Sequence, residues 1–363
     1  MLQILYRPIS PIFTASLPTQ ITITTDSDAA IDISVEIEGA TGFSTILYPY
    51  NGKAVFHDLR SIVEQTMLAD TRPFLSVILF AEQGTENANT PECICIYSRL
   101  AVSQSGLAFT SQHFLTTAQS FLLPRTATQH LSYFSPNAYQ SDDYTDCVVR
   151  PHDGGMPKTV RVSEGTFSVK ADDIYSVLVS PQTLQEQVAS DGTLLAFTVH
   201  RGSRSKTFYL TDTAPNLTLQ LLNEFLVPEY IHLRCVTKTK LSLDRSLATS
   251  QGSLSFYDDT SADEYESETA MLTPYEARRL SRLLLSSTIK AALTDIGTSL
   301  TISIPNSQSP IPIIITDLTS DISDAHNATN TVKFKWKYRT PQFPHTVPYP
   351  SNIFDDPFAR PFD

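Results

Sequence analysis

The sequence has a shortage of positive charge, which excludes one broad class of function. Its 26 lysines and arginines stand against 38 aspartates and glutamates, so the formal net charge is −12. A protein that binds nucleic acid needs clustered basic residues to neutralise phosphates. We therefore expect no general nucleic-acid partner, and the negative charge favours solubility.

Long apolar runs are also missing. No stretch approaches the roughly 20 apolar residues that a membrane-spanning helix needs. The first residues, MLQILYRPISPIF, are interrupted by Arg7 and Pro8 where a secretory signal requires a continuous apolar segment. We expect no membrane insertion, and a protein that is either cytoplasmic at synthesis or already separated from a leader peptide.

Cysteine is scarce, with four in 363 residues. Cys93 and Cys95 lie two residues apart in ECICIYSRL, so both belong to one face of a strand. This is not the CxxC spacing of a metal or redox site. We expect buried thiols without a disulfide framework.

Motifs for catalysis are absent as well: the sequence has no HExxH, GxSxG, P-loop or GxGxxG. His57 and Asp58 are neighbours in a strand and should point to opposite sides. RPHDGGMPK, with His152, and HRGSRSK, from His200 to Lys206, are expected to be solvated turns. We predict no enzyme, no cofactor and no metal site, although a hydrolase remains open if His152 or His200 meets a carboxylate in a cleft.

What the sequence does contain is alternation of apolar and polar residues, which is typical of antiparallel strands. ITITTDSDAAIDISVEIEG predicts two strands, and FSTILYPYNGKAVFHD predicts a hairpin that turns at Asn51 and Gly52. The next segment, LRSIVEQTML, has a helical apolar stripe, and Asp58 is expected to be its N-cap.

A second helix is predicted in TPYEARRLSRLLLSS. Thr273 and Glu276 have the spacing of a capping box, and Pro274 suits the first helical position. The buried face is expected to comprise Ala277, Leu280, Leu283 and Leu284. The outward face is expected to comprise Arg278, Arg279 and Arg282.

Taken together, the pattern predicts a mainly β protein with a minor α component, made of antiparallel β-sandwich or barrel-like modules with two short helices. We expect a β domain with one helix at 1–115, a central β domain at 116–215, an α+β domain at 216–340 and a Pro/Phe-rich tail at 341–363. QHFLTTAQSFLLPRTATQ is expected to connect two domains, and SPNAYQSDDYTDC to be a polar loop.

The strand predicted in TVKFKWKYRT has a basic face. Lys333, Lys335 and Lys337 alternate with apolar residues. These lysines could guard an edge strand or face solvent, bind a neighbouring subunit, or pair within the chain with the acidic stretch FYDDTSADEYESE. They are candidate partner-binding residues.

The tail SNIFDDPFARPFD contains a second candidate. Phe354, Phe358 and Phe362 are costly to leave in water, and Pro357 and Pro361 prevent a helix. We expect these phenylalanines to bind pockets on a neighbouring subunit or other partner.

Five segments, in order, resemble uncharacterised tail or other virion structural proteins encoded in prophages of Bacteroides-type gut bacteria. They are GKAVFHDLRSIVEQTML, LLNEFLVPEYIHL, TPYEARRLSRLLLSS, the pair PIIITDL and VKFKWKYRT, and NIFDDPF. The resemblance implies a β-rich structural protein with no catalytic residues. Its expected partners are further copies of itself or other particle proteins, and its expected final location is a virion or tail-like particle.

The residues alone favour the same class, because many strands with exposed edges suit assembly. A carbohydrate-binding or adhesin-like surface protein is the alternative. It predicts a row of exposed tyrosine or phenylalanine on one sheet face that binds a glycan.

Overall fold

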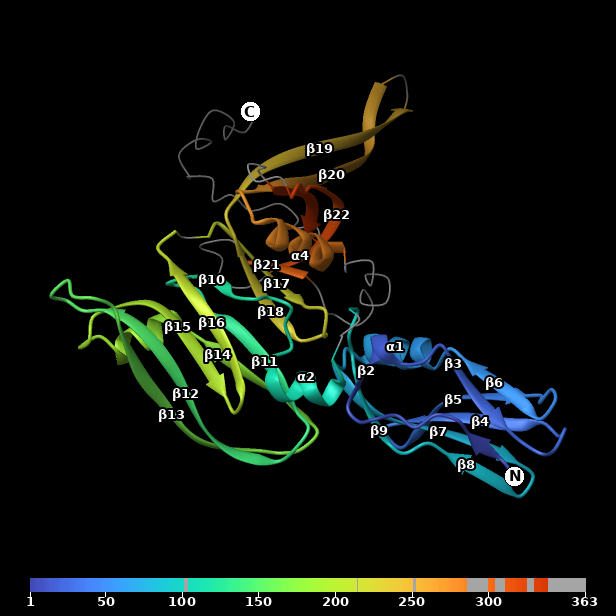
Figure 1. Ribbon diagram of the computed structural model, residues 1–363. Helices are drawn as coiled ribbons and strands as arrows, with labels where there is room; N and C mark the ends of the chain where they lie inside the picture. The colour runs from blue at the N-terminus through green and yellow to red at the C-terminus, as the bar shows by residue number, and fades with distance from the viewer. Residues whose placement is uncertain are drawn as a thin grey trace, which may run out of the picture.

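The computed structural model describes residues 1–100, 104–213, 215–250, 253–285, 300–303, 311–324 and 330–338. Within these ranges the predicted mainly β class is confirmed, but the chain has four α-helices instead of the two predicted, and its sheets form no closed barrel. Figure 1 shows several twisted sheets with helices packed beside them. Most strand pairs are antiparallel, but two are parallel: β2 (Ile12–Phe13) with β9 (Cys93–Ile96), and β10 (Phe121–Pro124) with β16 (Arg204–Thr211).

The first part of the chain forms two sheets that share one apolar core. The three-stranded sheet has the order β1 (Gln3–Ile4), β3 (Gln20–Thr24) and β6 (Lys53–His57). The six-stranded sheet has the order β2, β9, β7 (Phe74–Gln83), β4 (Ile31–Ile37) and β5 (Ala40–Leu47), with β8 (Glu86–Asn89) paired to β7. A 3-10 helix (Thr14–Ser16), α1 (Leu59–Asp70) and α2 (Gly106–Gln112) complete this part.

The middle of the chain builds a five-stranded and a two-stranded sheet around a second core. The larger has the order β10, β16, β15 (Thr193–Arg201), β12 (Tyr139–Arg150) and β13 (Lys158–Val169). The smaller pairs β11 (Gln129–Ser135) with β14 (Asp173–Val179), and α3 spans Pro181–Gln187.

The last part is a seven-stranded sheet with α4 (Pro274–Leu285) packed on one face. Its order is β18 (Pro228–Leu233), β17 (Leu217–Leu222), β21 (Leu300–Ser303), β22 (Ile311–Asp321), β23 (Thr331–Tyr338), β20 (Ser253–Thr269) and β19 (Cys235–Ser250). β19 and β20 are the longest of the described strands, and Figure 1 shows them projecting past the rest of the sheet as a ribbon.

A fourth apolar cluster joins the three parts of the chain. Phe13 and Ile96 come from the first part, Leu115 and Phe134 from the middle, and Phe225, with Val227, from the last. Phe13 and Phe225 have ring centroids 5.8 Å apart. The three parts are thus packed on one another through aromatic contacts, while the domain boundaries near 115, 215 and 340 stay predictions.

The periodicity predictions for the first strands are confirmed. One face of β3 and β4 is buried, and it consists of Ile21, Ile23, Ile31, Ile33, Val35 and Ile37. The alternation works as a predictor here because a strand that covers a core must send every second side chain into it.

The predicted hairpin is only half right. Asn51 and Gly52 form the turn, with φ values of 49° and 72°. Beyond one bridge between Tyr50 and Lys53, however, the two strands separate, and β5 pairs with β4 whereas β6 pairs with β3. The chain crosses between two sheets at this turn because β6 then buries its apolar residues beside those of β3 in the common core.

Two segments predicted as irregular belong to sheets. SPNAYQSDDYTDC lies largely in β12, which has strands paired on both sides. Two of its polar residues, Asp143 and Thr145, are buried on the same strand face as Cys147. They are accommodated because Asp143 pairs with Arg201 and Thr145 donates to Glu164. The expected connection QHFLTTAQSFLLPRTATQ contains β10 and buries Phe114, Leu115 and Ala118, so it forms part of the core.

Both predicted helices are present, but one cap differs. Thr273 and Glu276 make the capping box: the Glu276 amide donates to Thr273 Oγ1 at 3.2 Å, and the Thr273 amide donates to Glu276 Oε2 at 2.9 Å. Asp58 occupies the N-cap position of α1 without a capping hydrogen bond from its side chain. It has φ 70° and ψ 13°, a left-handed conformation that aspartate tolerates better than most residues.

This geometry predicts how α1 responds to substitution at Asp58. Asp58→Gly should be at least as stable as the natural chain, because glycine adopts positive φ without strain. Asp58→Ala should lower the free energy of unfolding by about 1 kcal/mol. Urea titration measures both values. A capping aspartate would instead make the glycine variant less stable than the natural chain.

Candidate functional site

A buried polar network lies where the middle and last parts of the chain meet. At its centre Arg279 of α4 forms an ion pair with Glu229 of β18, whose side chain is 1% exposed. Arg279 Nε also donates to Thr117 Oγ1 at 2.9 Å, and Thr116 Oγ1 donates to Glu229 Oε2 at 3.1 Å. One guanidinium therefore binds a helix, a strand and the segment before β10 together.

The turn between β17 and β18 completes this network. Asn223 Nδ2 donates to the Leu115 carbonyl at 2.8 Å and to Glu229 Oε2 at 3.0 Å. Thr117 Oγ1 donates to Glu224 Oε1 at 2.9 Å. Burial tends to lower the pKa of Arg279, but the Glu229 and Glu224 carboxylates outweigh it and hold that pKa above its ordinary value. The arginine is thus a permanent cation in a closed polar site.

The prediction that Arg279 faces outward is wrong. Tyr275, Arg279 and Leu283 follow one another at intervals of four residues and so form one row along α4. Tyr275 donates its hydroxyl to the Thr117 carbonyl, and Leu283 is buried. The position of Leu283 on the buried face is the sequence signal that places Arg279 on that side. Arg278 does lie outward and pairs with Asp324.

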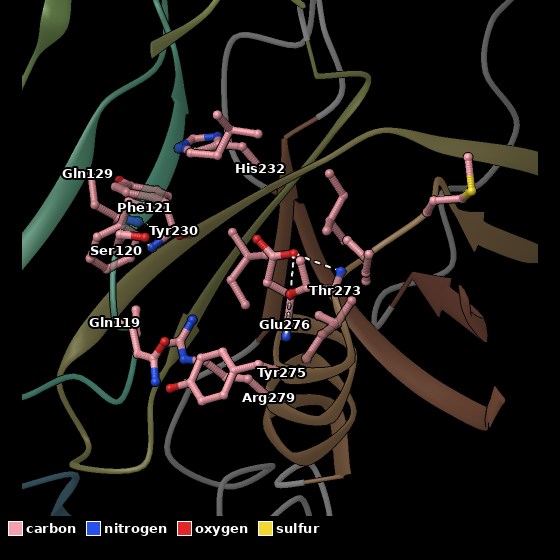
Figure 2. Close-up of a pocket in the computed structure, with 17 residues that line it drawn as sticks. Gln119, Ser120, Phe121, Gln129, Tyr230, His232, Thr273, Tyr275, Glu276 and Arg279 are labelled. Atoms are coloured by element: carbon pink, nitrogen blue, oxygen red, sulfur yellow. Dashed lines mark hydrogen bonds between the residues drawn. The ribbon is translucent and has the colours of Figure 1, made fainter. Parts of the chain in front are cut away.

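Beside the network is a cavity of about 520 Å³. In Figure 2, Phe121, Tyr230 and His232 form one wall, and Thr273 and Glu276 at the start of α4 form the other. Arg279 borders it with its side chain turned toward the network. The complete lining is Ala118, Gln119, Ser120, Phe121, Leu122, Gln129, Tyr230, Ile231, His232, Leu233, Met271, Leu272, Thr273, Tyr275, Glu276, Arg279 and Leu280.

His232 has both ring nitrogens engaged. Its Nε2 lies 2.9 Å from the Thr128 carbonyl, which can only accept, so Nε2 carries the proton. Nδ1 lies 3.1 Å from Thr218 Oγ1 and accepts from that hydroxyl. Burial lowers the pKa of His232, which keeps the ring neutral. The histidine therefore stabilises the cavity wall instead of acting as a free base.

The basic face of β23 pairs within the sheet. Lys333 lies 3.3 Å from Glu268, Lys335 lies 3.2 Å from Asp317, and Lys337 lies 3.7 Å from Glu264. The acidic stretch expected as an intramolecular partner is β20, and it supplies two of these carboxylates. Cross-strand pairs of opposite charge on an exposed face stabilise a sheet modestly.

The interpretation of these lysines as guards of an edge strand is wrong, because β23 lies between β22 and β20. Charge alternates across the face instead: Lys238 of β19 is in register with Glu266 of β20, which is in register with Lys335 of β23. The lysines remain between 41 and 46% exposed. Their role in binding a partner stays a prediction.

The basic segment HRGSRSK is not a solvated turn throughout. Arg201 is buried and pairs with Glu164 and, at 3.5 Å, with Asp143. Arg204 is buried as well and donates to the Thr110 carbonyl at 2.8 Å and the Phe134 carbonyl at 2.9 Å. Arginine suits these positions because its planar group can satisfy several acceptors at once.

One of the two histidines considered for catalysis does meet a carboxylate. His200 Nε2 lies 3.3 Å from Asp146 Oδ2, and its ring stacks on Tyr144. Asp146 also accepts from Arg161 Nε at 2.9 Å, so a guanidinium already balances its charge. His152 lies in an exposed turn and contacts the Ala189 carbonyl at 2.9 Å.

Aromatic residues bear on both candidate functions, the particle protein and the glycan-binding surface protein. Phe354, Phe358 and Phe362 lie outside the described residues. Trp336 is buried and stacks on Tyr265 with centroids 4.1 Å apart, so it offers no exposed face to a sugar.

All four cysteines are buried and free. Burial raises the pKa of Cys147 to about 11 and that of Cys235 to about 12. Among the residues that the structure describes, no three His, Cys, Asp or Glu side chains gather as a metal site would require. In the same ranges, no helix is long and apolar enough to cross a membrane.

Comparison with solved structures finds five chains with distant similarity to this one. No protein-family model matches the chain, and no curated protein does. A chain from a solved virion of a native gene transfer agent particle is similar at 11% identity, with 34% of this chain and 92% of that chain covered and a TM-score of 0.21. Trypsin-activated α-2-macroglobulin from Escherichia coli is similar at 9% identity, with 74% and 22% covered and a TM-score of 0.20. At these TM-scores neither likeness establishes a shared fold.

The buried network predicts unequal costs for two neighbouring arginines. Arg279→Ala should lower the free energy of unfolding by about 3–5 kcal/mol, because it leaves Glu229 charged and buried without its partner. Arg278→Ala is the matched control, and it should cost less than about 1 kcal/mol because its pair with Asp324 is exposed. Chemical denaturation measures both, and equal costs would contradict the assigned network.

Proposed function

We propose that this chain is a non-enzymatic structural protein that assembles with further protein chains in a phage tail or tail-like particle. The observation that carries the proposal is the ribbon of β19 and β20. Over Tyr265–Glu268, β20 also pairs with β23. From Lys240 to Ser250 and from Ser253 to Glu264, the two strands pair with each other and with no other described strand.

Such a ribbon suits binding to a neighbour. A two-stranded ribbon is marginally stable on its own in water, and no described strand pairs with the backbone donors and acceptors along either outer edge of this part. A neighbouring chain can satisfy those groups by adding a strand or by packing on the ribbon. A 16-residue and a 17-residue strand reach well beyond the sheet that anchors them. We infer that the ribbon is an arm that becomes stabilised on assembly.

The kind of particle is inferred from the sequence resemblance to prophage-encoded tail and virion proteins. The proposed partners are further copies of this chain or other particle proteins, and the proposed location is the cytoplasm at synthesis and then the particle. Buried charged groups support a structural role, because Arg279, Arg201 and Arg204 are committed to contacts that hold the fold together.

Shortening the ribbon tests this proposal. Lys240 and Glu264 face each other in register, so residues 241–263 can be replaced by Asn-Gly, which closes a two-residue hairpin. A tagged natural chain expressed in its own host should sediment with particles on a density gradient, whereas the shortened chain should remain with free protein. The shortened chain should unfold at nearly the same temperature, because its core clusters are intact.

The matched control removes a different exposed turn. Residues 153–156 between β12 and β13 can be replaced by Asn-Gly without touching the ribbon, and this chain should sediment like the natural one. If the natural chain never sediments with particles, the proposed function is wrong. If the ribbon-shortened chain still does, the arm is not what binds the neighbour.

The tail makes a separate prediction. A chain stopped at Thr340 loses Phe354, Phe358 and Phe362, and we expect it to bind its partner more weakly by about tenfold or more, because buried aromatic anchors dominate binding energy. The triple change of these residues to serine is the control that keeps the tail's length. Quantitative co-sedimentation measures both, and unchanged incorporation of the shortened chain would rule out the anchors.

A further inference from the structure

Strand β5 is an unusual edge. It ends the six-stranded sheet, and no described strand pairs with its outer side. Its sequence is ATGFSTIL. Among described strands of eight residues or more, it is the only one without Asp, Glu, Lys, Arg or His. An exposed uncharged edge of this length is an open template for another strand.

Apolar side chains lie exposed along the same edge. Phe43 and Ile46 on β5 are 36% and 55% exposed, and Tyr48 and Tyr50 in the turn that follows are 77% and 81% exposed. Monomeric proteins usually mask such groups on an edge strand with charge, proline or a covering loop. Four of the eight residues of β5, namely Thr41, Phe43, Thr45 and Ile46, are of types that favour strands.

Two other long edges of this molecule carry like charges that disfavour pairing with the same edge of a second copy. β19, the edge of the seven-stranded sheet, carries Lys238 and Lys240 in its exposed part. β13, the edge of the five-stranded sheet, carries Lys158 and Arg161. Two copies that paired through either edge would bring like charges near each other, which destabilises a strand pair. The contrast identifies β5 as the edge suited to self-association.

We propose that β5 pairs with β5 of a second copy of this chain, antiparallel and about a two-fold axis. Whatever the register between the two strands, each residue of Ala40–Leu47 that is paired with a residue of this segment in the other copy has an uncharged partner. The contact therefore neither buries a charged side chain nor brings like charges together. A two-fold contact uses the same patch on both copies, which an uncharged strand satisfies by itself. Tyr48 and Tyr50 add aromatic surface at each end of the contact.

This dimer rests on the proposed function, because it supplies one contact of the proposed assembly. It uses a different strand from the ribbon, so the β5 contact can be absent while the ribbon still binds a neighbour. Pairing would join the six-stranded sheets of two copies into one continuous sheet. It would also satisfy the outer backbone groups of β5, because each strand donates to and accepts from the other.

The test is a lysine placed on the edge. In Ile46→Lys the new side chain lies opposite Asp32 of β4, a favourable cross-strand pair that keeps the fold. Light scattering of the full natural chain over a concentration series should show a monomer that doubles in mass. Ile46→Lys should raise the dissociation constant at least tenfold, because each copy brings a charge to the apolar contact.

Leu178→Lys is the matched control. Leu178 lies on β14 and is 59% exposed, close to the 55% of Ile46, and this variant should dimerise within twofold of the natural chain. Hydrogen exchange gives a second readout: in the natural chain, amides of residues 40–47 should exchange more slowly as the protein concentration rises. In Ile46→Lys that dependence should disappear.

Two results would overturn the proposal. One is a natural chain that stays monomeric at every concentration, since β5 would then not bind a second copy. The other is an Ile46→Lys variant that dimerises as the natural chain does. If that dimer is instead lost when the ribbon is shortened, copies associate through β19 and β20, and the proposed function survives without this contact.

Discussion

The ion pair between Arg279 and Glu229 is the constraint on which the arrangement of this molecule depends. Both groups are buried, and a buried charge without its partner costs several kcal/mol. Because Thr116, Thr117 and Asn223 bind the same two side chains, α4, β18 and the segment before β10 must be placed together. The apolar junction around Phe225 then packs this assembly on the first part of the chain.

The seven-stranded sheet that α4 covers has two unlike faces. Phe334 and Trp336 of β23 are buried toward the core, whereas Lys333 and Lys335, which alternate with them, pair with carboxylates on the other side. The sheet therefore needs no second layer over its charged face. That leaves its long outer strands available to extend beyond the core, which is the arrangement from which an assembly role is inferred.

Local periodicity is enough to predict most strands, both long helices and the capping box at Thr273. What it cannot supply is the order of strands in the sheets. The placement of β23 in the interior and the separation of β5 from β6 depend on pairing between residues far apart in sequence. The orientation of Arg279 is predicted wrongly because its partner, Glu229, is also distant, although Glu229 shares a strand face with buried Leu233. The phenylalanine tail lies outside the described residues.

The ribbon of β19 and β20 has a consequence for how such a protein can diverge. Its strands run antiparallel from Cys235 opposite Thr269 to Ser250 opposite Ser253. If one residue is added to or removed from each strand near the tip, every residue pair between that point and the base of the ribbon is preserved. If two residues are added to or removed from each strand, the tip residues also keep their original faces. The reach of the arm can therefore change in steps of about 3.4 Å per residue without disturbing the sheet at its base. A change in the length of the ribbon would therefore alter how far the protein reaches while its core stays the same.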